Sequence, residues 1–280
     1  MKTKLILIEG LPGFGKSTTA KLVHELLLEM KVDAELFFEG NLDHPADYDG
    51  VAYYTKQEFE ELLSCHENFK ELFLSWVIKK ENGYFLPYQK IKNDVGESIP
   101  TNLYNEIYQR DIYELPLEQN IEVIIENWKS FAQNAESGNK VYIFECCFIQ
   151  NPLTVGMVKY NAKKETIVNY VMGLAQSVEG LNPILLYVDQ ADLDYSFKKA
   201  VQERPKEWFE GFVNYYTKQG YGKENELEGL EGTLSVLKAR KEVEMDVFSQ
   251  LDMKKHIILN DYKQEEYKNK LKEILTSEII

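Results

Sequence analysis

The sequence has no long hydrophobic run. Its first apolar stretch, Leu5 to Ile8, is four residues long and leads straight into a glycine-rich segment. A membrane-spanning helix needs about 20 consecutive apolar residues, and a secretory signal also needs a longer apolar core than this. The sequence therefore predicts neither a signal peptide nor a membrane span, and we expect a cytoplasmic protein without a membrane partner.

Cysteine and histidine are also scarce. Of the three cysteines, Cys146 and Cys147 are adjacent in an apolar run, so their spacing indicates neither a disulfide framework nor a metal site. The four histidines are dispersed along the chain, which gives little support to a catalytic histidine or a histidine metal site. We expect the cysteines to be buried, reduced thiols.

Positive charge is in short supply. The chain carries 32 Lys and Arg against 46 Asp and Glu, a formal net charge of -14, and its three arginines are Arg110, Arg204 and Arg240. A surface this acidic repels polyanions, which argues against general nucleic-acid binding and favours a small-molecule partner. The oligomeric state, including a homo-oligomer, is left open.

What the sequence does contain is an alternation of short apolar strands and helices. Its composition, 44% hydrophobic and 28% charged, is typical of a globular protein. We expect strands at residues 4–9, 34–39, 141–145, 184–189 and 256–260, separated by helices. Apolar strands in this setting predict a parallel sheet that is covered on both faces. The predicted fold class is therefore α/β, with three αβα layers, a five-stranded parallel sheet and a helical insertion.

Two segments interrupt this alternation. We expect a single domain over residues 1–280 with a helical insertion at about 42–138, in which Thr55 and Glu58 form a capping box for a helix running toward Lys79. A second, lid-like segment covers about 203–232. Its part from Lys218 to Gly232 holds four glycines among four glutamates, a composition that predicts a mobile loop.

A phosphate-binding motif follows the first strand. Gly10 to Ser17 reads GLPGFGKS and matches the pattern G-x-x-x-x-G-K-S between an apolar strand and an amphipathic helix. Glycines let backbone N–H groups turn toward phosphates, and the helix N-terminus adds partial positive charge. We expect Lys16 to bind the β- and γ-phosphates and Ser17 to ligate Mg²⁺. Thr18 either touches the α-phosphate or is an ordinary first-turn residue.

The predicted ligands are therefore ATP and Mg²⁺. The predicted nucleotide-binding residues are Gly10, Leu11, Pro12, Gly13, Phe14, Gly15, Lys16, Ser17 and Thr18.

Acidic residues end the second and third predicted strands, and with the N-terminal loop they carry a resemblance to a known family. The sequence resembles the P-loop kinases of the nucleoside-monophosphate-kinase-like group, which includes thymidylate and deoxynucleoside kinases. The resemblance implies that Glu39 accepts the proton of the acceptor hydroxyl; the alternative is a solvated carboxylate at a strand end. It also implies that Glu145 holds Mg²⁺, with Asp189 at the end of the fourth strand as the competing residue.

The sequence departs from this group at Cys146, where the similar motifs carry an arginine that helps to hold phosphates. Because arginine is rare in the chain, a neutral or hydroxyl-bearing acceptor is favoured over a monophosphate. The resemblance places Arg204 and Arg240 near the lid, where they would stabilise the transferring phosphoryl group. The alternative for each is a surface charge. Arg110 lies in the insertion, and an ion pair with the adjacent Asp111 is as well supported there as contact with a substrate.

Together these features predict ATP-dependent phosphoryl transfer to a small molecule. The catalytic candidates are Lys16, Glu39, Arg204 and Arg240, and the metal candidates are Ser17 and Glu145. A nucleotide-hydrolysing switch and a non-catalytic nucleotide-binding regulatory protein are the alternatives. No Asn-Lys-x-Asp signature follows a strand, which disfavours guanine specificity.

Overall fold

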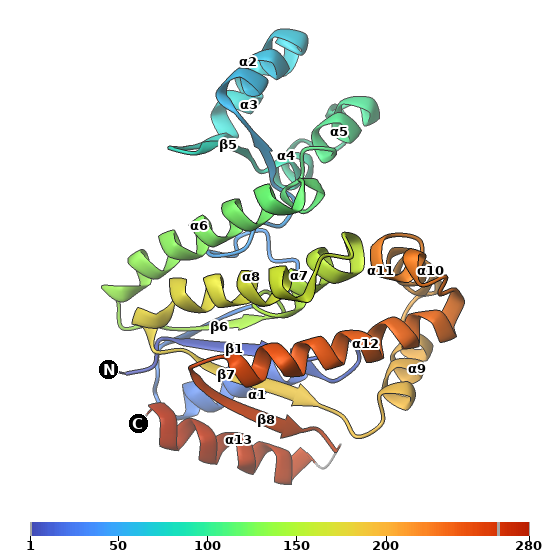
Figure 1. Cartoon of the computed structure of the whole chain (residues 1–280). Coiled ribbons are helices and arrows are strands. Elements are labelled where there is room, and N and C mark those ends of the chain that lie inside the picture. Colours follow the sequence, from blue (N-terminus) through green and yellow to red (C-terminus); the bar gives the residue numbers. More distant parts are fainter. Residues whose placement is uncertain (1, 262–263, 280) are drawn as a thin grey trace. The chain divides into compact units, whose positions relative to one another are not determined.

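Five parallel strands form the central sheet. The computed structural model describes residues 2–261 and 264–279. Within them the strands lie in the order β2-β6-β1-β7-β8 (Figure 1). Their bounds are β1 Leu5–Glu9, β2 Ala34–Phe37, β6 Val141–Glu145, β7 Ile184–Asp189 and β8 Lys254–Leu259. Each neighbouring pair in this order is parallel.

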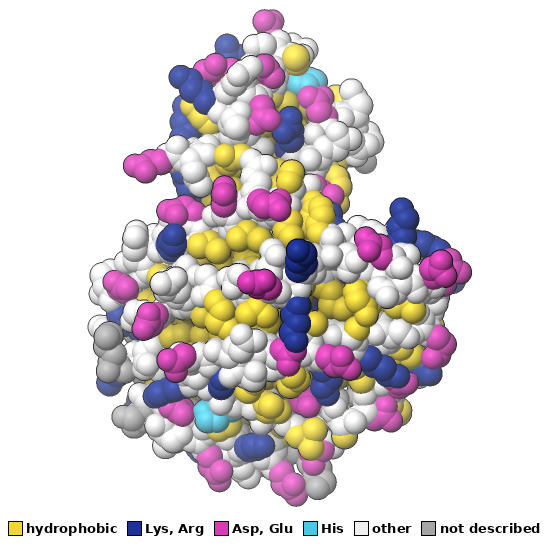
Figure 2. Space-filling model, viewed as in Figure 1, with side chains coloured by type: hydrophobic (Ala, Val, Ile, Leu, Met, Phe, Trp, Pro, Cys, Tyr) yellow, Lys and Arg dark blue, Asp and Glu magenta, His cyan; other side chains and the backbone are white. Residues whose placement is uncertain are grey.

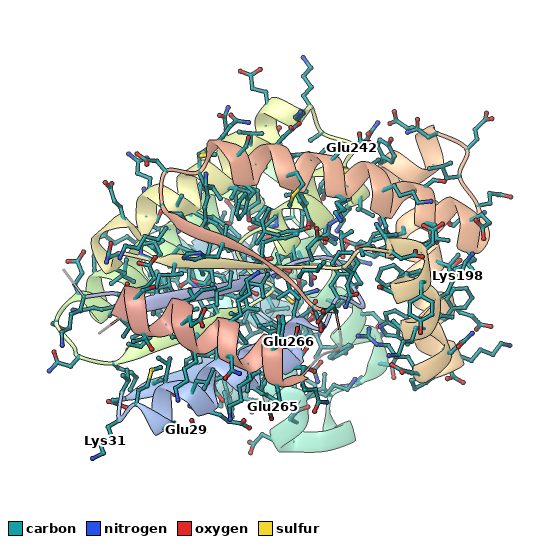
Figure 3. All side chains as sticks on the ribbon, turned by 90° about the horizontal axis from the view of Figure 1, so that it is seen from below. Glu29, Lys31, Lys198, Glu242, Glu265 and Glu266 are labelled. Carbon is teal, nitrogen blue, oxygen red and sulfur yellow. The ribbon has the colours of Figure 1, made fainter. Side chains whose placement is uncertain are left out.

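Helices cover both faces of this sheet. α1 Lys16–Glu29 and α13 Gln264–Ile279 lie on one side, and α8 Lys164–Ser177 and α12 Gly229–Gln250 lie on the other (Figures 1 and 3). The apolar strands fit this arrangement because a strand buried on both faces has no solvated side for polar residues. The predicted α/β fold, with three layers around a five-stranded parallel sheet, is confirmed.

The phosphate motif lies at one edge of the sheet. Because parallel strands all end at the same edge, the segments that follow β1, β2, β6 and β7 meet there. Behind this edge, the buried face of α1 packs against the first strand in the main hydrophobic core. Its core residues are Ala20, Val23, Leu26 and Leu27, with Ile6 and Ile8 from β1. The motif is therefore attached to the main hydrophobic core.

The chain divides into two compact units. One comprises Met1–Glu39 with Trp128–Ile280 and contains the parallel sheet; the other is Gly40–Asn127. The insertion expected at about 42–138 overlaps the second unit, and α6 Leu117–Glu136 runs from one unit into the other. The organisation of the chain as a single domain stays a prediction.

The second unit contains helices, as expected for the insertion, together with a small sheet that the sequence analysis did not predict. In its described residues, β3 Ala52–Tyr54, β5 Gly83–Leu86 and β4 Ile78–Lys80 form an antiparallel sheet in that order. Aromatic residues at paired positions, such as Tyr53 opposite Phe85, suit strands better than helices. Four helices accompany the sheet: α2 Lys56–Cys65, α3 Lys70–Trp76, α4 Tyr88–Val95 and α5 Thr101–Tyr108.

The helix expected from Thr55 toward Lys79 begins as predicted and then breaks. The Thr55 side chain accepts a hydrogen bond from the Glu58 amide, and the Glu58 carboxylate accepts one from the Thr55 amide at 2.8 Å, which confirms the capping box. α2 ends at Cys65, a 3₁₀ turn follows at Glu67–Phe69, and α3 ends before β4. Cys65 is exposed, unlike the buried Cys146 and Cys147, so the expectation of three buried thiols was wrong at this position.

The lid-like segment is mostly helical. α9 Leu193–Glu203, α10 Lys206–Thr217 and α11 Gly220–Glu224 precede α12, which begins at Gly229. A mobile loop from Lys218 to Gly232 is therefore not observed. Gly222 serves close packing instead, since a Cβ there would lie 2.0 Å from the carbonyl oxygen of Tyr216. None of the described helices is both long and apolar enough to cross a membrane.

Candidate active site

The phosphate motif joins β1 to α1 in a turn that only glycine can make. Gly10 has φ 143°, and a Cβ there would lie 2.3 Å from the carbonyl oxygen of Val188. Gly15, the N-cap of α1, has φ 94°, and its Cβ would meet the Asn260 side chain at 2.5 Å. L-residues rarely adopt such dihedrals, and neighbouring atoms leave no room for a side chain. The backbone at the N-terminus of α1 is thus shaped for close approach to an anion.

The side chain of Lys16 is buried and hydrogen-bonded to the phosphate loop. Its side chain is 7% exposed, and its ammonium group donates a hydrogen bond of 3.1 Å to the carbonyl oxygen of Leu11. Burial alone would lower the pKa of Lys16, but nearby acidic groups, among them Glu39 and Glu145, raise it above its usual value. Lys16 is therefore a cation with a local excess of negative charge around it, and it lines the same cavity as the loop.

Ser17 and Glu145 meet across the sheet edge. The Ser17 hydroxyl, in the first turn of α1, donates a hydrogen bond of 2.7 Å to Oε1 of Glu145 at the end of β6. The other carboxylate oxygen of Glu145 accepts a hydrogen bond of 3.3 Å from the backbone amide of Glu39. The three residues predicted from separate parts of the sequence are thereby brought together. Thr18 is exposed beside them and also lines the cavity.

Glu39 has a partner that the sequence analysis did not identify. It lies two residues past β2, and its Oε1 accepts a hydrogen bond of 2.9 Å from the side-chain amide of Gln150. Gln150 begins a short helix, α7 Gln150–Leu153, after β6. The sequence signal that could have identified Gln150 is its position as a polar residue directly after the apolar run that follows β6.

Asp189, the competing metal candidate, is already engaged. Its carboxylate contacts the ammonium group of Lys241 at 2.6 Å and accepts a hydrogen bond of 2.8 Å from the backbone amide of Gln190. Asp189 is not among the residues that line the cavity, whereas Glu145 is. The position of Glu145 suits the proposed metal role better.

The two lid arginines have different surroundings. Arg204 directly follows α9, is exposed, lines the cavity and lies over the Trp208 ring at 4.2 Å. Arg240 is 0% exposed within α12 and forms an ion pair of 2.7 Å with Glu244. A surface position for Arg240 was wrong, and its burial separates it from the cavity.

The remaining donors of Arg240 are used within the wall of the site. They donate hydrogen bonds to the Thr154 hydroxyl at 2.9 Å, the Tyr216 hydroxyl at 2.7 Å and the Gln150 carbonyl oxygen at 3.2 Å. Contact with a phosphoryl group would require these hydrogen bonds to break. Arg240 therefore supports residues that line the cavity and does not itself reach it.

The cavity at this edge of the sheet has a volume of about 900 Å³. Its walls come from the phosphate loop, from α9 and α10, and from the start of α13; Lys198 and Glu265 mark α9 and α13 in Figure 3. Asn260 lines the cavity and donates a hydrogen bond of 3.0 Å to the Phe14 carbonyl oxygen. The volume is ample for a nucleotide.

Glu9 is an acidic residue beside the site that the sequence analysis did not single out. It ends β1, is 1% exposed, and accepts hydrogen bonds from the backbone amides of Phe148 at 2.7 Å and Gln150 at 2.9 Å. Burial raises the pKa of Glu9 to about 7, although the backbone amides oppose this shift. Glu9 therefore fixes the turn that carries Gln150.

The chain has a distant structural relative and no match by sequence. The sequence matches no protein-family model and no curated protein. Among solved structures, the chain is similar to a thymidylate kinase from Candida albicans, with 14% sequence identity and a TM-score of 0.42. The match covers 99% of this chain and 92% of that one. A likeness this distant gives no information about the substrate.

Proposed function

We propose that this chain transfers the γ-phosphoryl group of Mg²⁺-ATP to a hydroxyl group of a small molecule. The observation that carries the proposal is the hydrogen bond of 2.7 Å between Ser17 and Glu145, with Glu39 joined to the same carboxylate. These hydrogen bonds connect the phosphate loop to Glu145 at the end of β6 and to Glu39 just after β2, and all three line one cavity. A phosphoryl transferase needs this combination of an anion site, a metal site and a carboxylate for the nucleophile.

The donor set fits Mg²⁺. A serine hydroxyl and a carboxylate oxygen 2.7 Å apart are hard oxygen ligands of the kind that Mg²⁺ prefers. In the described residues, no group of three or more His, Cys, Asp and Glu residues could hold a metal ion. The pair Ser17 and Glu145 suits a metal ion that is bound jointly by one or two side chains and the phosphates. When bound, Mg²⁺ would neutralise charge on the phosphate oxygens.

The remaining roles follow from position. Lys16 binds the phosphate oxygens, and Glu39 accepts the proton of the acceptor hydroxyl as its oxygen attacks the γ-phosphorus and ADP leaves. Arg204 is the lid cation that faces the transferring group. Arg240 is not part of this mechanism because its guanidinium is buried and hydrogen-bonded to the wall residues.

The electrostatics of the site favour an acceptor without a phosphate group. Glu39 and Glu145 line the cavity and the buried Glu9 lies behind them, while the position expected to hold arginine is the neutral thiol of Cys146. Beside Glu39 and Glu145, a phosphate on the acceptor would meet this negative charge and no arginine at position 146. We assign the cations that line the cavity, which are Lys16, Lys21, Lys199, Arg204 and Lys268, to the phosphates of ATP. On the face shown in Figure 2, acidic and basic side chains are interspersed, and no extended basic surface for a polyanion is visible there.

The direct test is transfer of labelled γ-phosphate from ATP to a panel of nucleosides, nucleoside monophosphates, sugars and aminoglycosides. We expect a labelled product with a neutral hydroxyl compound, and none with the Lys16→Ala variant. Phosphate released to water alone would favour a nucleotide-hydrolysing switch. Tight ATP binding without any turnover would favour a non-catalytic regulatory protein, and either result would reject the proposed transfer.

A further inference from the structure

Gln150 connects the proposed proton acceptor to the buried framework of the site. Its side-chain amide donates a hydrogen bond of 2.9 Å to Oε1 of Glu39. In the described part of the chain, this is the hydrogen bond that restrains the Glu39 carboxylate, and the second oxygen, Oε2, has none. The Gln150 side chain is 7% exposed and lines the cavity. The orientation of Glu39 therefore depends on the position of Gln150.

The backbone of Gln150 is fixed on both sides. Its N–H group donates a hydrogen bond of 2.9 Å to Glu9. Its carbonyl oxygen accepts hydrogen bonds from the Thr154 hydroxyl at 2.7 Å and from the guanidinium of Arg240 at 3.2 Å. Arg240 is in turn held by its buried ion pair with Glu244. These contacts leave little freedom for the residue that holds Glu39.

The orientation of the Gln150 amide is set by Glu39. A carboxylate can only accept, so the NH₂ group must face Glu39 and the amide oxygen must face the other way. That oxygen is buried and accepts no hydrogen bond from the described residues. A buried acceptor without a partner lowers stability, and such groups in native proteins occur preferentially at functional sites. The Gln150 amide therefore donates a hydrogen bond to Glu39, while its own oxygen is left without a donor.

We infer that Gln150 is a positioning residue for the proposed transfer: it holds one oxygen of Glu39 so that the other faces the acceptor hydroxyl. This role rests on the proposed function. The proton passes from the hydroxyl to Glu39, the hydroxyl oxygen bonds to the γ-phosphorus, and the bond to ADP breaks; Gln150 exchanges no proton. Gln150 thereby supplies a neutral hydrogen-bond donor in a site where Cys146 stands in place of arginine.

Gln150→Met tests this role because methionine has a similar length and no amide. We expect kcat to fall roughly 10–100-fold, as misplacement of a catalytic group does, while the ATP dissociation constant changes less than about two-fold. The melting temperature should stay the same or rise, because an unpaired buried oxygen is removed. The matched control is Gln190→Met, which removes another buried amide with an unpaired atom outside the cavity and should leave kcat unchanged.

A double-mutant cycle with Glu39→Gln shows whether Gln150 acts through Glu39. In the Glu39→Gln background, Gln150→Met should change the residual kcat less than about two-fold, because residues that act as a unit are not additive. Equal losses in both backgrounds or an unchanged kcat would overturn the role. Gln150→Asn, which shortens the side chain by one methylene group, replaces Gln150→Met if that variant does not fold.

The same measurements separate this inference from the proposed function. If the wild-type protein transfers the phosphoryl group but the cycle is additive, the proposed function stands and the role of Gln150 is rejected. If wild-type protein transfers nothing, or Glu39→Gln turns over normally, the assignment of Glu39 as proton acceptor fails and the role of Gln150 fails with it.

Discussion

The hydroxyl group of Ser17 donates a hydrogen bond of 2.7 Å to Glu145, although 128 positions separate the two residues in the chain. One lies in the first turn of α1 and the other ends β6, the strand that pairs with β1. Parallel pairing brings both to the same edge of the sheet. An insertion between β2 and β6 can therefore be large without displacing the two residues from each other.

This geometry predicts how the metal requirement depends on Glu145. The Glu145→Gln variant should need roughly 10–100-fold more Mg²⁺ for half-maximal transfer, the scale on which metal sites respond to a lost partner. Asp189→Asn is the matched control, because Asp189 contacts Lys241 at 2.6 Å and does not line the cavity. Titration of activity with Mg²⁺ measures the requirement of both variants, Glu145→Gln and Asp189→Asn. A larger effect for Asp189→Asn would transfer the metal role to that residue.

The site was predictable from the sequence where its signals are local or follow from strand order. The loop from Gly10 to Ser17 is a contiguous motif, and Glu39 and Glu145 lie at the ends of predicted strands. The sheet brings these segments together without any information about side chains.

Other features could not be predicted because their causes are tertiary. Strands of three or four residues, such as Ala52–Tyr54, are too short to show an alternating pattern. Arg240 and Glu244 have the spacing of a surface ion pair on a helix, and nothing in that spacing reveals their burial. Gly222 looks like a loop residue until its contact with Tyr216 is known.

The cavity-lining position of Arg204 predicts a catalytic loss. Arg204→Ala should lower kcat by on the order of 10²-fold if its guanidinium stabilises the charge of the transferring group. Arg204→Lys should recover part of the rate, because it keeps the charge and loses the planar contact with Trp208. Arg110→Ala is the control, since this exposed arginine pairs with Glu58 outside the cavity. Similar losses for Arg204→Ala and Arg110→Ala would contradict a role specific to the site.

The buried Arg240–Glu244 pair predicts a pattern of stability changes. Arg240→Met leaves Glu244 charged and buried, with the Tyr187 hydroxyl still donating to it at 2.6 Å, and should cost about 3–5 kcal/mol of unfolding free energy. The double variant Arg240→Met with Glu244→Leu should recover much of this loss, because no unpaired charge remains. Urea denaturation of the two variants measures the difference. Equal destabilisation of both would show that the lost wall contacts dominate, and not the unpaired buried charge of Glu244.

The buried carboxyl of Glu9 predicts a stability that falls as pH rises from 4.5 to about 7. Burial raises the pKa of Glu9 from 4.5 to about 7, so the folded state holds a proton that the unfolded state has lost between these values. The unfolded state then binds fewer protons, and the free energy of unfolding should decrease by about 3 kcal/mol from pH 4.5 to 7 on account of this group. Above pH 7 the contribution is constant.

Urea denaturation of wild-type protein and Glu9→Gln between pH 4.5 and 8 isolates this effect, because every other titrating group is common to both. The difference in unfolding free energy between the two proteins should change with pH only inside the window and level off above it. A glutamine can satisfy one of the two backbone amides that Glu9 now binds, so Glu9→Gln will also carry a constant offset in stability. A pH-independent difference would mean that Glu9 keeps the same protonation state in both folded and unfolded protein, and that its two backbone hydrogen bonds outweigh its burial.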